Sequence, residues 1–73
     1  MEIRPGLYLH SKTGHRYRVL GVAKDSENLE DMVVYEALDT NAESKLWVRP
    51  AIMFLEEVEI DGQKKPRFKY LGE

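Results

Sequence analysis

Cysteine is absent from this chain of 73 residues, which excludes a disulfide framework, a thiolate metal site and a cysteine nucleophile. A small chain that folds without covalent staples suits a reducing compartment, so we expect a cytoplasmic protein. No apolar run approaches the roughly 20 residues that a membrane-spanning helix needs. No apolar segment follows residues 1–5 either, so we expect neither a signal peptide nor membrane association.

Patterns of a catalytic or metal centre are missing as well. His10 and His15 flank a glycine-containing turn at a spacing that matches no metal signature. The acids Glu27, Glu30 and Asp31 lack the alternating ligands and the distal glutamate of a calcium loop. The 5 glycines are scattered, so no loop is built to hold a phosphate group. We therefore expect a protein that is not an enzyme, with no catalytic residue, no cofactor and no metal ion.

Two segments of the chain carry charges of one sign only, although the net charge of the whole protein is only −2. Residues 1–24 carry five bases and one acid, residues 25–44 carry seven acids and no base, and residues 63–70 carry four bases and no acid. If the two basic segments meet in the fold, one side of the molecule becomes positive and the opposite side negative. The overall balance is less positive than that of most nucleic-acid-binding proteins.

The turn residues of the chain are spaced as in a small all-β protein, and the length predicts a single domain over residues 1–73. Strands are expected over residues 6–10, 17–24, 32–38, 46–49, 56–60 and 66–71. A turn that contains Gly14 follows the first strand, and Asp61-Gly62 predicts a hairpin turn. Gly21 lies in a strand whose two faces are both partly apolar, so we expect that strand to bend or to cross between layers there. Residues 25–31 form an acidic connection with at most one helical turn.

Five to six short strands with at most one short helical or 3₁₀ turn predict a small antiparallel barrel. Pro50 lacks a backbone donor and ends the fourth strand. Residues 51–55 can then form the short turn, which places Met53 or Phe54 in the core. Closure of the barrel removes exposed strand edges, which suits a short chain. The alternative is a barrel that is left partly open and pairs with a second copy.

The segment from Leu46 to Phe54 holds the only tryptophan of the chain. Trp47 and Arg49 are two residues apart on one strand, so they share a face and the guanidinium can lie against the indole. This pair is either a recognition surface or part of the core. For the apolar side chains Val33, Val48, Phe54 and Phe68 we expect core positions.

The order of several motifs identifies a family resemblance. The motifs are Gly6-x-Tyr8-x-His10, Gly14-x-x-Tyr17-x-Val19, Val33-Val34-Tyr35-x-x-Leu38, Trp47-Val48-Arg49-Pro50-x-x-Met53-Phe54, and Pro66-Arg67-Phe68 after Gly62. With this order, over residues 4–71, the chain resembles the small bacterial proteins of domain-of-unknown-function family 1653. The resemblance implies a cytoplasmic SH3-like β-barrel, alone or attached to other domains, and it implies no particular activity. The family pattern marks His10, Tyr17, Glu30, Tyr35, Trp47, Arg49, Pro50, Phe54, Arg67 and Phe68.

These observations predict a binding or interaction module that recognises a protein segment or a second subunit. The expected ligand-binding residues are Tyr17, Tyr35, Trp47, Arg49 and Arg67, with His10 and Glu30 beside them. Glu30 is the carboxylate expected to pair with Arg49 or Arg67, because a buried arginine needs such a partner. The alternative is a nucleic-acid-binding module that uses the basic C-terminal hairpin, with Lys64, Lys65, Arg67 and Lys69.

Overall fold

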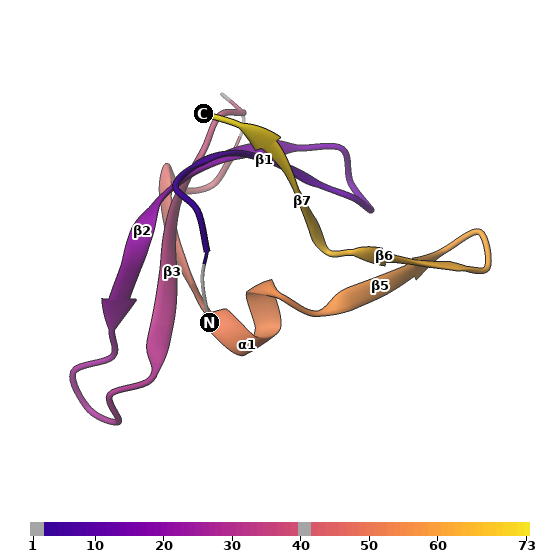
Figure 1. The fold of residues 1–73 in the computed structure, drawn as a ribbon. Helices are drawn as coiled ribbons and strands as arrows, with labels where there is room; N and C mark the ends of the chain where they lie inside the picture. Colours follow the sequence, from indigo (N-terminus) through magenta and orange to yellow (C-terminus); the bar gives the residue numbers. More distant parts are fainter. Residues whose placement is uncertain (1–2, 40–41) are drawn as a thin grey trace.

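Seven strands and one short helix make up the fold (Figure 1), in a computed structural model that describes residues 3–39 and 42–73. The elements are β1 (Gly6–His10), β2 (Arg16–Lys24), β3 (Asp31–Ala37), β4 (Leu46–Pro50), α1 (Ala51–Phe54), β5 (Glu57–Ile60), β6 (Gln63–Pro66) and β7 (Phe68–Gly72). Five strands form one antiparallel sheet in the order β4-β3-β2-β1-β7. Strands β5 and β6 form a separate hairpin. The expected all-β class with one short helical turn is confirmed.

The main sheet does not close into the expected barrel. Its two edges are β4 and β7, which are not paired with each other. Between them the chain passes through α1 and the β5–β6 hairpin, and the hairpin extends away from the sheet (Figure 1). Pro50 ends β4 without a backbone N–H to continue a ladder, and the chain turns at once into α1. Strand spacing in the sequence predicts every strand of the described residues except β6, and it does not decide whether the two edge strands meet.

The irregularity of β2 and the turns of the chain lie at the residues where the sequence predicts them. The pairing of β2 with β3 shifts register between Val19 and Gly21, so the strand changes its side-chain alternation at the expected glycine. Asp61 and Gly62 both have positive φ, 52° and 79°, which is the backbone of a two-residue hairpin turn. In the acidic connection, the Leu29 N–H donates to the Asp25 carbonyl at 2.8 Å, and this turn is not continued into a helix.

The core lies on the inner face of the main sheet, where α1 covers it. The buried apolar side chains are Tyr8, Val19, Val33, Tyr35, Ala37, Ala51, Phe54 and Phe68. The core positions expected for Val33, Phe54 and Phe68 are therefore confirmed, and of the two candidates on α1 it is Phe54, not Met53, that is buried. No helix in the described parts of the chain is long and apolar enough to cross a membrane.

The expected core position of Val48 is wrong, because 60% of its surface is exposed. Val48 pairs with Val34, whereas its neighbours Trp47 and Arg49 pair with the buried Tyr35 and Val33. Successive residues of a strand point to opposite faces. The alternation that turns Trp47 and Arg49 inward therefore turns Val48 outward.

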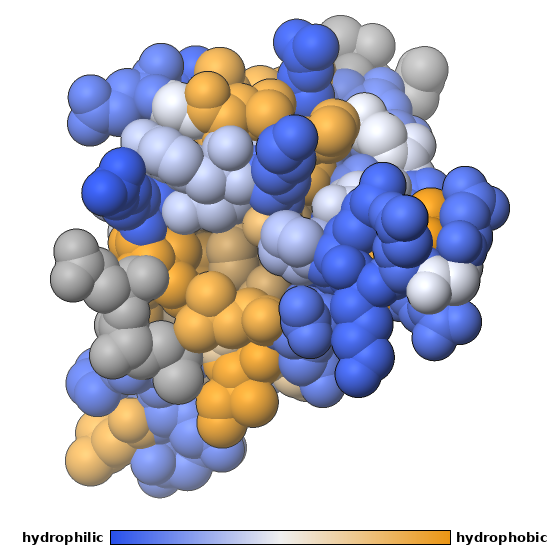
Figure 2. Space-filling model, turned by 45° about the vertical axis from the view of Figure 1, so that its right-hand side comes forward, coloured by the Kyte–Doolittle hydropathy of each residue, from blue (hydrophilic) through white to orange (hydrophobic). Residues whose placement is uncertain are grey.

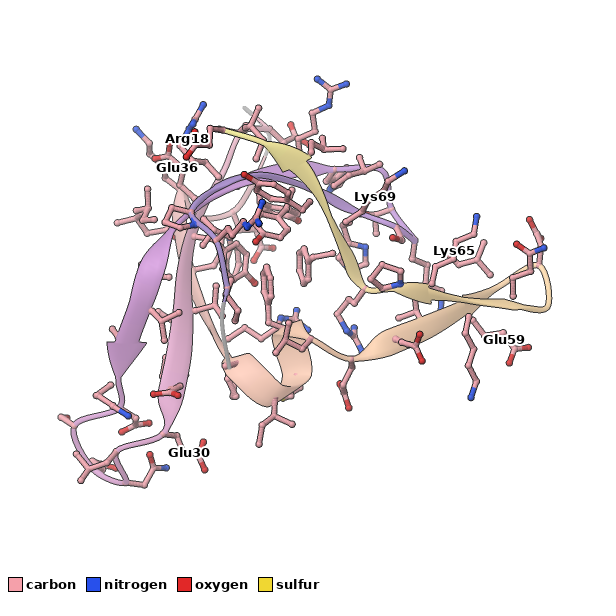
Figure 3. The ribbon with its side chains drawn as sticks, viewed as in Figure 1. Arg18, Glu30, Glu36, Glu59, Lys65 and Lys69 are labelled. Carbon is pink, nitrogen blue, oxygen red and sulfur yellow. The ribbon has the colours of Figure 1, made fainter. Side chains whose placement is uncertain are left out.

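The two basic segments do meet, since β1 lies between β2 and β7. Their charges are partly offset across the strands: Arg18 on β2 lies opposite Glu36 on β3 (Figure 3). In the space-filling view, hydrophobic side chains gather in the middle of one face, and mostly hydrophilic ones cover the right-hand part of the view (Figure 2). The positive face expected from the sequence is therefore interrupted by acids.

Candidate functional site

Basic and aromatic side chains gather around the ring of Phe68 on the inner face of the main sheet. His10 and Tyr17 contact the ring edge-to-face, at centroid distances of 5.0 and 5.8 Å. Tyr35 lies 5.8 Å away, and Phe54 stacks on Phe68 at 4.2 Å. The Arg49 guanidinium carbon lies 5.7 Å from the ring centroid. We call these residues, together with the adjacent Arg67, the Phe68 cluster.

Each strand of the main sheet contributes one side chain to the Phe68 cluster. His10 on β1 pairs directly with Phe68 on β7, so their side chains share a face. Tyr17 on β2 and Tyr35 on β3 contact each other at 5.3 Å. Arg49 on β4 pairs with the buried Val33 on β3, so its side chain lies on the same inner face as the other four. The cluster thus follows from strand register and from the period-two alternation of each strand.

Arg49 is half-buried and lies against aromatic rings. Its Nε donates to the Tyr35 hydroxyl at 3.4 Å, a long hydrogen bond. Within residues 3–39 and 42–73, none of the ion pairs includes Arg49. The expected stacking on Trp47 is replaced by the position above Phe68. Arg49 therefore presents a charge that lies against the Phe68 ring and that belongs to none of the ion pairs among the described residues.

Arg67 is held at the junction of β6 and β7. Its backbone N–H donates to the Glu56 carbonyl at 2.9 Å, and its own carbonyl accepts from Ser11 N–H at 2.9 Å. The Nη2 atom lies 3.4 Å from Glu56 Oε1. The Nε atom is buried and has no acceptor among the described residues. The Arg67 guanidinium is therefore held beside Glu56, and its buried Nε donor has no acceptor among the described residues.

His10 stays neutral more readily than an ordinary histidine. Burial lowers the pKa of its imidazole, and the positive charges of Arg67, Arg49, His15 and Lys12 lower it further. Its Nδ1 accepts a hydrogen bond from the Thr13 N–H at 3.3 Å. In the neutral ring the proton is therefore on Nε2, which can serve as a donor.

This pKa predicts a dependence of stability on pH. Because the pKa of His10 is lower in the fold than the ordinary 6.5, the unfolded chain binds more protons as the pH falls below about 6.5, and stability falls with it. We expect wild type to lose more unfolding free energy between pH 7.5 and 5.5 than His10→Asn, which keeps an acceptor for Thr13 but does not titrate. Urea unfolding at each pH measures this difference. Equal slopes for wild type and His10→Asn would contradict the prediction.

Trp47 lies at the rim of the Phe68 cluster and is 38% exposed. It pairs across the strands with Tyr35, and its Nε1 donates to the Ser44 carbonyl at 2.9 Å. The indole is thus anchored by one edge, and part of its surface faces solvent. Trp47 is therefore neither fully in the core nor fully part of an exposed recognition surface, which are the two alternatives that the sequence left open.

For Trp47→Ala we expect a loss of about 1.5 kcal/mol in the free energy of unfolding, between the cost of an exposed and of a buried aromatic. The loss comes from the half-covered indole area and its hydrogen bond to Ser44. Urea unfolding followed by far-UV circular dichroism measures it, since the variant has no tryptophan fluorescence. A loss above about 3 kcal/mol would place the ring in the core.

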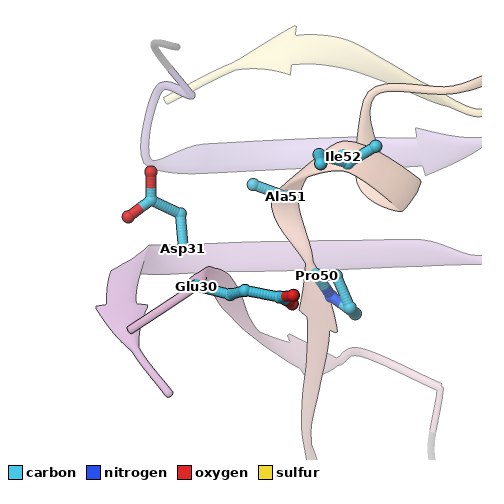
Figure 4. A pocket seen from close by; sticks show the side chains of 5 residues that line it. All are labelled: Glu30, Asp31, Pro50, Ala51 and Ile52. Atoms are coloured by element: carbon cyan, nitrogen blue, oxygen red, sulfur yellow. The ribbon is translucent and has the colours of Figure 1, made fainter. Parts of the chain in front are cut away.

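Glu30 does not join the Phe68 cluster. It lies at the start of β3 and lines a separate pocket with Asp31, Pro50, Ala51 and Ile52 (Figure 4). The expected ion pair of Glu30 with Arg49 or Arg67 is not formed among the described residues, and Arg67 pairs with Glu56 instead. The family pattern marks Glu30, but it contains no strand register that would place this carboxylate beside either arginine.

Sequence reasoning missed Glu56, although the hairpin contains the signal. Pairing outward from the Asp61-Gly62 turn runs from Ile60 with Gln63 to Glu57 with Pro66. The next pair in this count is Glu56 with Arg67. Counting from a two-residue turn therefore predicts the partner that the structure shows.

The lysines of the nucleic-acid alternative are divided between two surroundings. Lys64 lies across the hairpin from Glu59. Lys65 and Lys69 line one groove with Leu9, Ser11 and Pro66 (Figure 3). Arg67 turns to Glu56 and the Phe68 cluster. Within the parts of the chain that the structure describes, no group of His, Asp and Glu is placed to hold a metal ion.

Fold and site together define a small, open β-sheet domain with a basic and aromatic inner face. The chain belongs to the DUF1653 family, whose model, described as a protein of unknown function, matches residues 6–70. It is similar to a crystal structure of a DUF1653 protein from Bordetella bronchiseptica, with 37% identity and a TM-score of 0.89 over 97% of this chain and 90% of that one. No curated protein matches the sequence. The family expected from the motif order is confirmed.

Proposed function

We propose that this protein is a non-catalytic binding module, located in the cytoplasm, that recognises a segment of another protein through the half-buried side chains at the edge of the Phe68 cluster, which are His10, Tyr17, Arg49 and Arg67. The observation that carries the proposal is the Phe68 cluster, to which all five strands contribute a side chain. Tyrosine, tryptophan and arginine are the residues that carry most binding energy in protein interfaces. Four of the expected ligand-binding residues, Tyr17, Tyr35, Arg49 and Arg67, lie in this cluster, and Trp47 lies at its rim.

The charged members of the cluster favour binding over a purely structural role. Replacing buried charges by apolar side chains of similar volume is often neutral or stabilising. A sheet that needed only a core at this position could hold an apolar residue in place of the half-buried Arg49. A guanidinium that lies against the Phe68 ring without an ion-pair partner among the described residues is better explained by a ligand that uses it.

The surroundings of His10 support a non-catalytic site. General acid–base catalysis needs two titrating groups placed around one substrate atom. The groups that shift the pKa of His10 are four bases, and none of them is a carboxylate. Its ring packs edge-to-face on Phe68. Such a histidine contributes polarity and shape to a binding surface.

Selection of random peptides displayed on phage tests the proposal. We expect peptides enriched on the wild-type protein to lose at least tenfold in affinity for Arg49→Gln. Arg18→Gln is the matched control, because Arg18 lies on the outer face of the sheet opposite Glu36. Enriched peptides that bind Arg49→Gln as well as wild type, or no enrichment at all, would overturn the proposal. Sedimentation that shows a dimer masking the cluster would replace the peptide with a second copy.

A second candidate function is favoured by the groove that Lys65 and Lys69 line together. Two lysines at one groove can bind neighbouring phosphates of a nucleic acid. This function predicts oligonucleotide binding that weakens steeply with salt, and Lys65→Gln with Lys69→Gln lowers the salt slope by about two. No change in amide chemical shifts with an oligonucleotide at low salt would exclude it.

A further inference from the structure

The charge balance of the Phe68 cluster indicates what kind of group it binds. The Arg67 guanidinium lies 3.4 Å from the carboxylate of Glu56. The Arg49 guanidinium belongs to none of the ion pairs among the described residues. The cluster therefore holds one arginine with an ion-pair partner and one whose guanidinium can still take a carboxylate.

The unused donors lie on the same two arginines. Arg67 Nε is buried without an acceptor among the described residues. Arg49 uses Nε for a long hydrogen bond to Tyr35, and no ion pair of the described residues includes its guanidinium. Most buried hydrogen-bond donors in native proteins have an acceptor, so a buried donor without one needs an explanation. A bound ligand that accepts this hydrogen bond would explain it.

We propose that the Phe68 cluster binds a single carboxylate group of a protein segment, held by Arg49 and Arg67 beside the Phe68 ring. The inference rests on the proposed function and adds the chemistry of the ligand. A carboxylate matches the planar donor fork of a guanidinium and forms paired hydrogen bonds with it. One carboxylate also gives Arg49 an ion-pair partner, which none of the ion pairs among the described residues supplies.

A polyanion fits the same place poorly. Glu56 stays beside Arg67, and the negative charge of Asp39 acts on Tyr17, whose pKa is raised mainly by burial and then by its neighbours Tyr35 and Asp39. A strand of phosphates passing the cluster would meet these two carboxylates. A monovalent group can lie between the arginines without approaching them.

His10 provides an internal reporter of the bound group. Its pKa is lowered by burial and by Arg67, Arg49, His15 and Lys12. A carboxylate that neutralises the two arginines must raise the His10 pKa by linkage, and affinity must then increase as the pH falls. A ring that only packs in the core would show no such change.

An NMR titration with small probes tests the inference on the whole chain. At constant ionic strength, we expect acetate to shift the Nε–Hε signals of Arg49 and Arg67 and to raise the His10 pKa, whereas chloride does neither. In Arg49→Gln the acetate affinity falls at least tenfold. Lys12→Gln is the matched control, because it removes a base that acts on His10 without belonging to the cluster. No acetate response at the arginines, an equal response to chloride, or a stronger response to dimethyl phosphate would overturn the inference.

Two peptides distinguish the sources of the carboxylate. One carries an internal glutamate between blocked ends, and the other has a free C-terminal carboxylate and neutral side chains. The inference expects at least one of them to bind more tightly than the same peptide with glutamine or a C-terminal amide. If the phage-selected peptides bind the cluster through Arg49 but retain full affinity without any carboxylate, this inference fails and the proposed function stands. If no peptide binds although acetate does, the proposed function fails and the carboxylate site stands.

Discussion

Phe68→Ala is expected to lower the free energy of unfolding by about 3–5 kcal/mol, the range found for buried phenylalanines. Phe68 is 6% exposed, and its ring contacts His10, Tyr17, Tyr35, Phe54 and Arg49. Its removal leaves a cavity that the rings from β1, β2, β3 and α1 cannot fill without moving. Small domains have total stabilities of about 5 kcal/mol, so much of the variant should be unfolded at 37 °C.

Urea unfolding followed by Trp47 fluorescence measures this loss. Phe68→Leu keeps most of the volume, so its loss should be clearly smaller. Val48→Ala is the control on the outer face, where 60% exposure predicts a change within about 0.5 kcal/mol. A loss below about 1 kcal/mol for Phe68→Ala would mean that the cluster does not support the fold.

The strands could be predicted from the sequence because their signals are local. Alternation, β-branched and aromatic runs and glycine turns predict six of the seven strands of the described residues, all but β6, and the break at Gly21. The same local rules place Trp47 and Arg49 on one face. Applied consistently, they also turn Val48 outward, so that error came from treating a valine as core by composition alone.

The open sheet and the position of Glu30 could not be predicted in this way. Whether β4 meets β7 depends on the path of α1 and the hairpin between them, and that path is set by packing of Phe54 onto Phe68. The partner of Arg67 depends on hairpin register, which selects Glu56. Charge composition names candidate partners, but only register places two side chains together.

The open edge and the Phe68 cluster are connected. A closed barrel would bring β4 next to β7 and would surround Arg49 and Phe68 with strand backbone. With the sheet open, the two edge strands each contribute to the cluster, Arg49 from β4 and Phe68 from β7. The same departure from closure, which the sequence offered only as the alternative of a partly open barrel, therefore allows a basic side chain to lie beside the core and remain half-buried rather than enclosed.

Gly6→Ala is expected to destabilise the fold by about 3 kcal/mol, through backbone strain combined with a steric clash. Gly6 has φ of 137°, and a Cβ at this position would lie 2.6 Å from the Gly72 carbonyl oxygen and 3.2 Å from Tyr70 Cε1. The oxygen belongs to the backbone of β7, which is paired with β1, so it cannot move without disturbing the register that places His10 opposite Phe68. Gly21→Ala is the matched control, since a Cβ there meets no atom within 4 Å. Thermal and urea unfolding of the two variants should separate them clearly, and a loss below about 1 kcal/mol for Gly6→Ala would show that β1 and β7 are not held this closely.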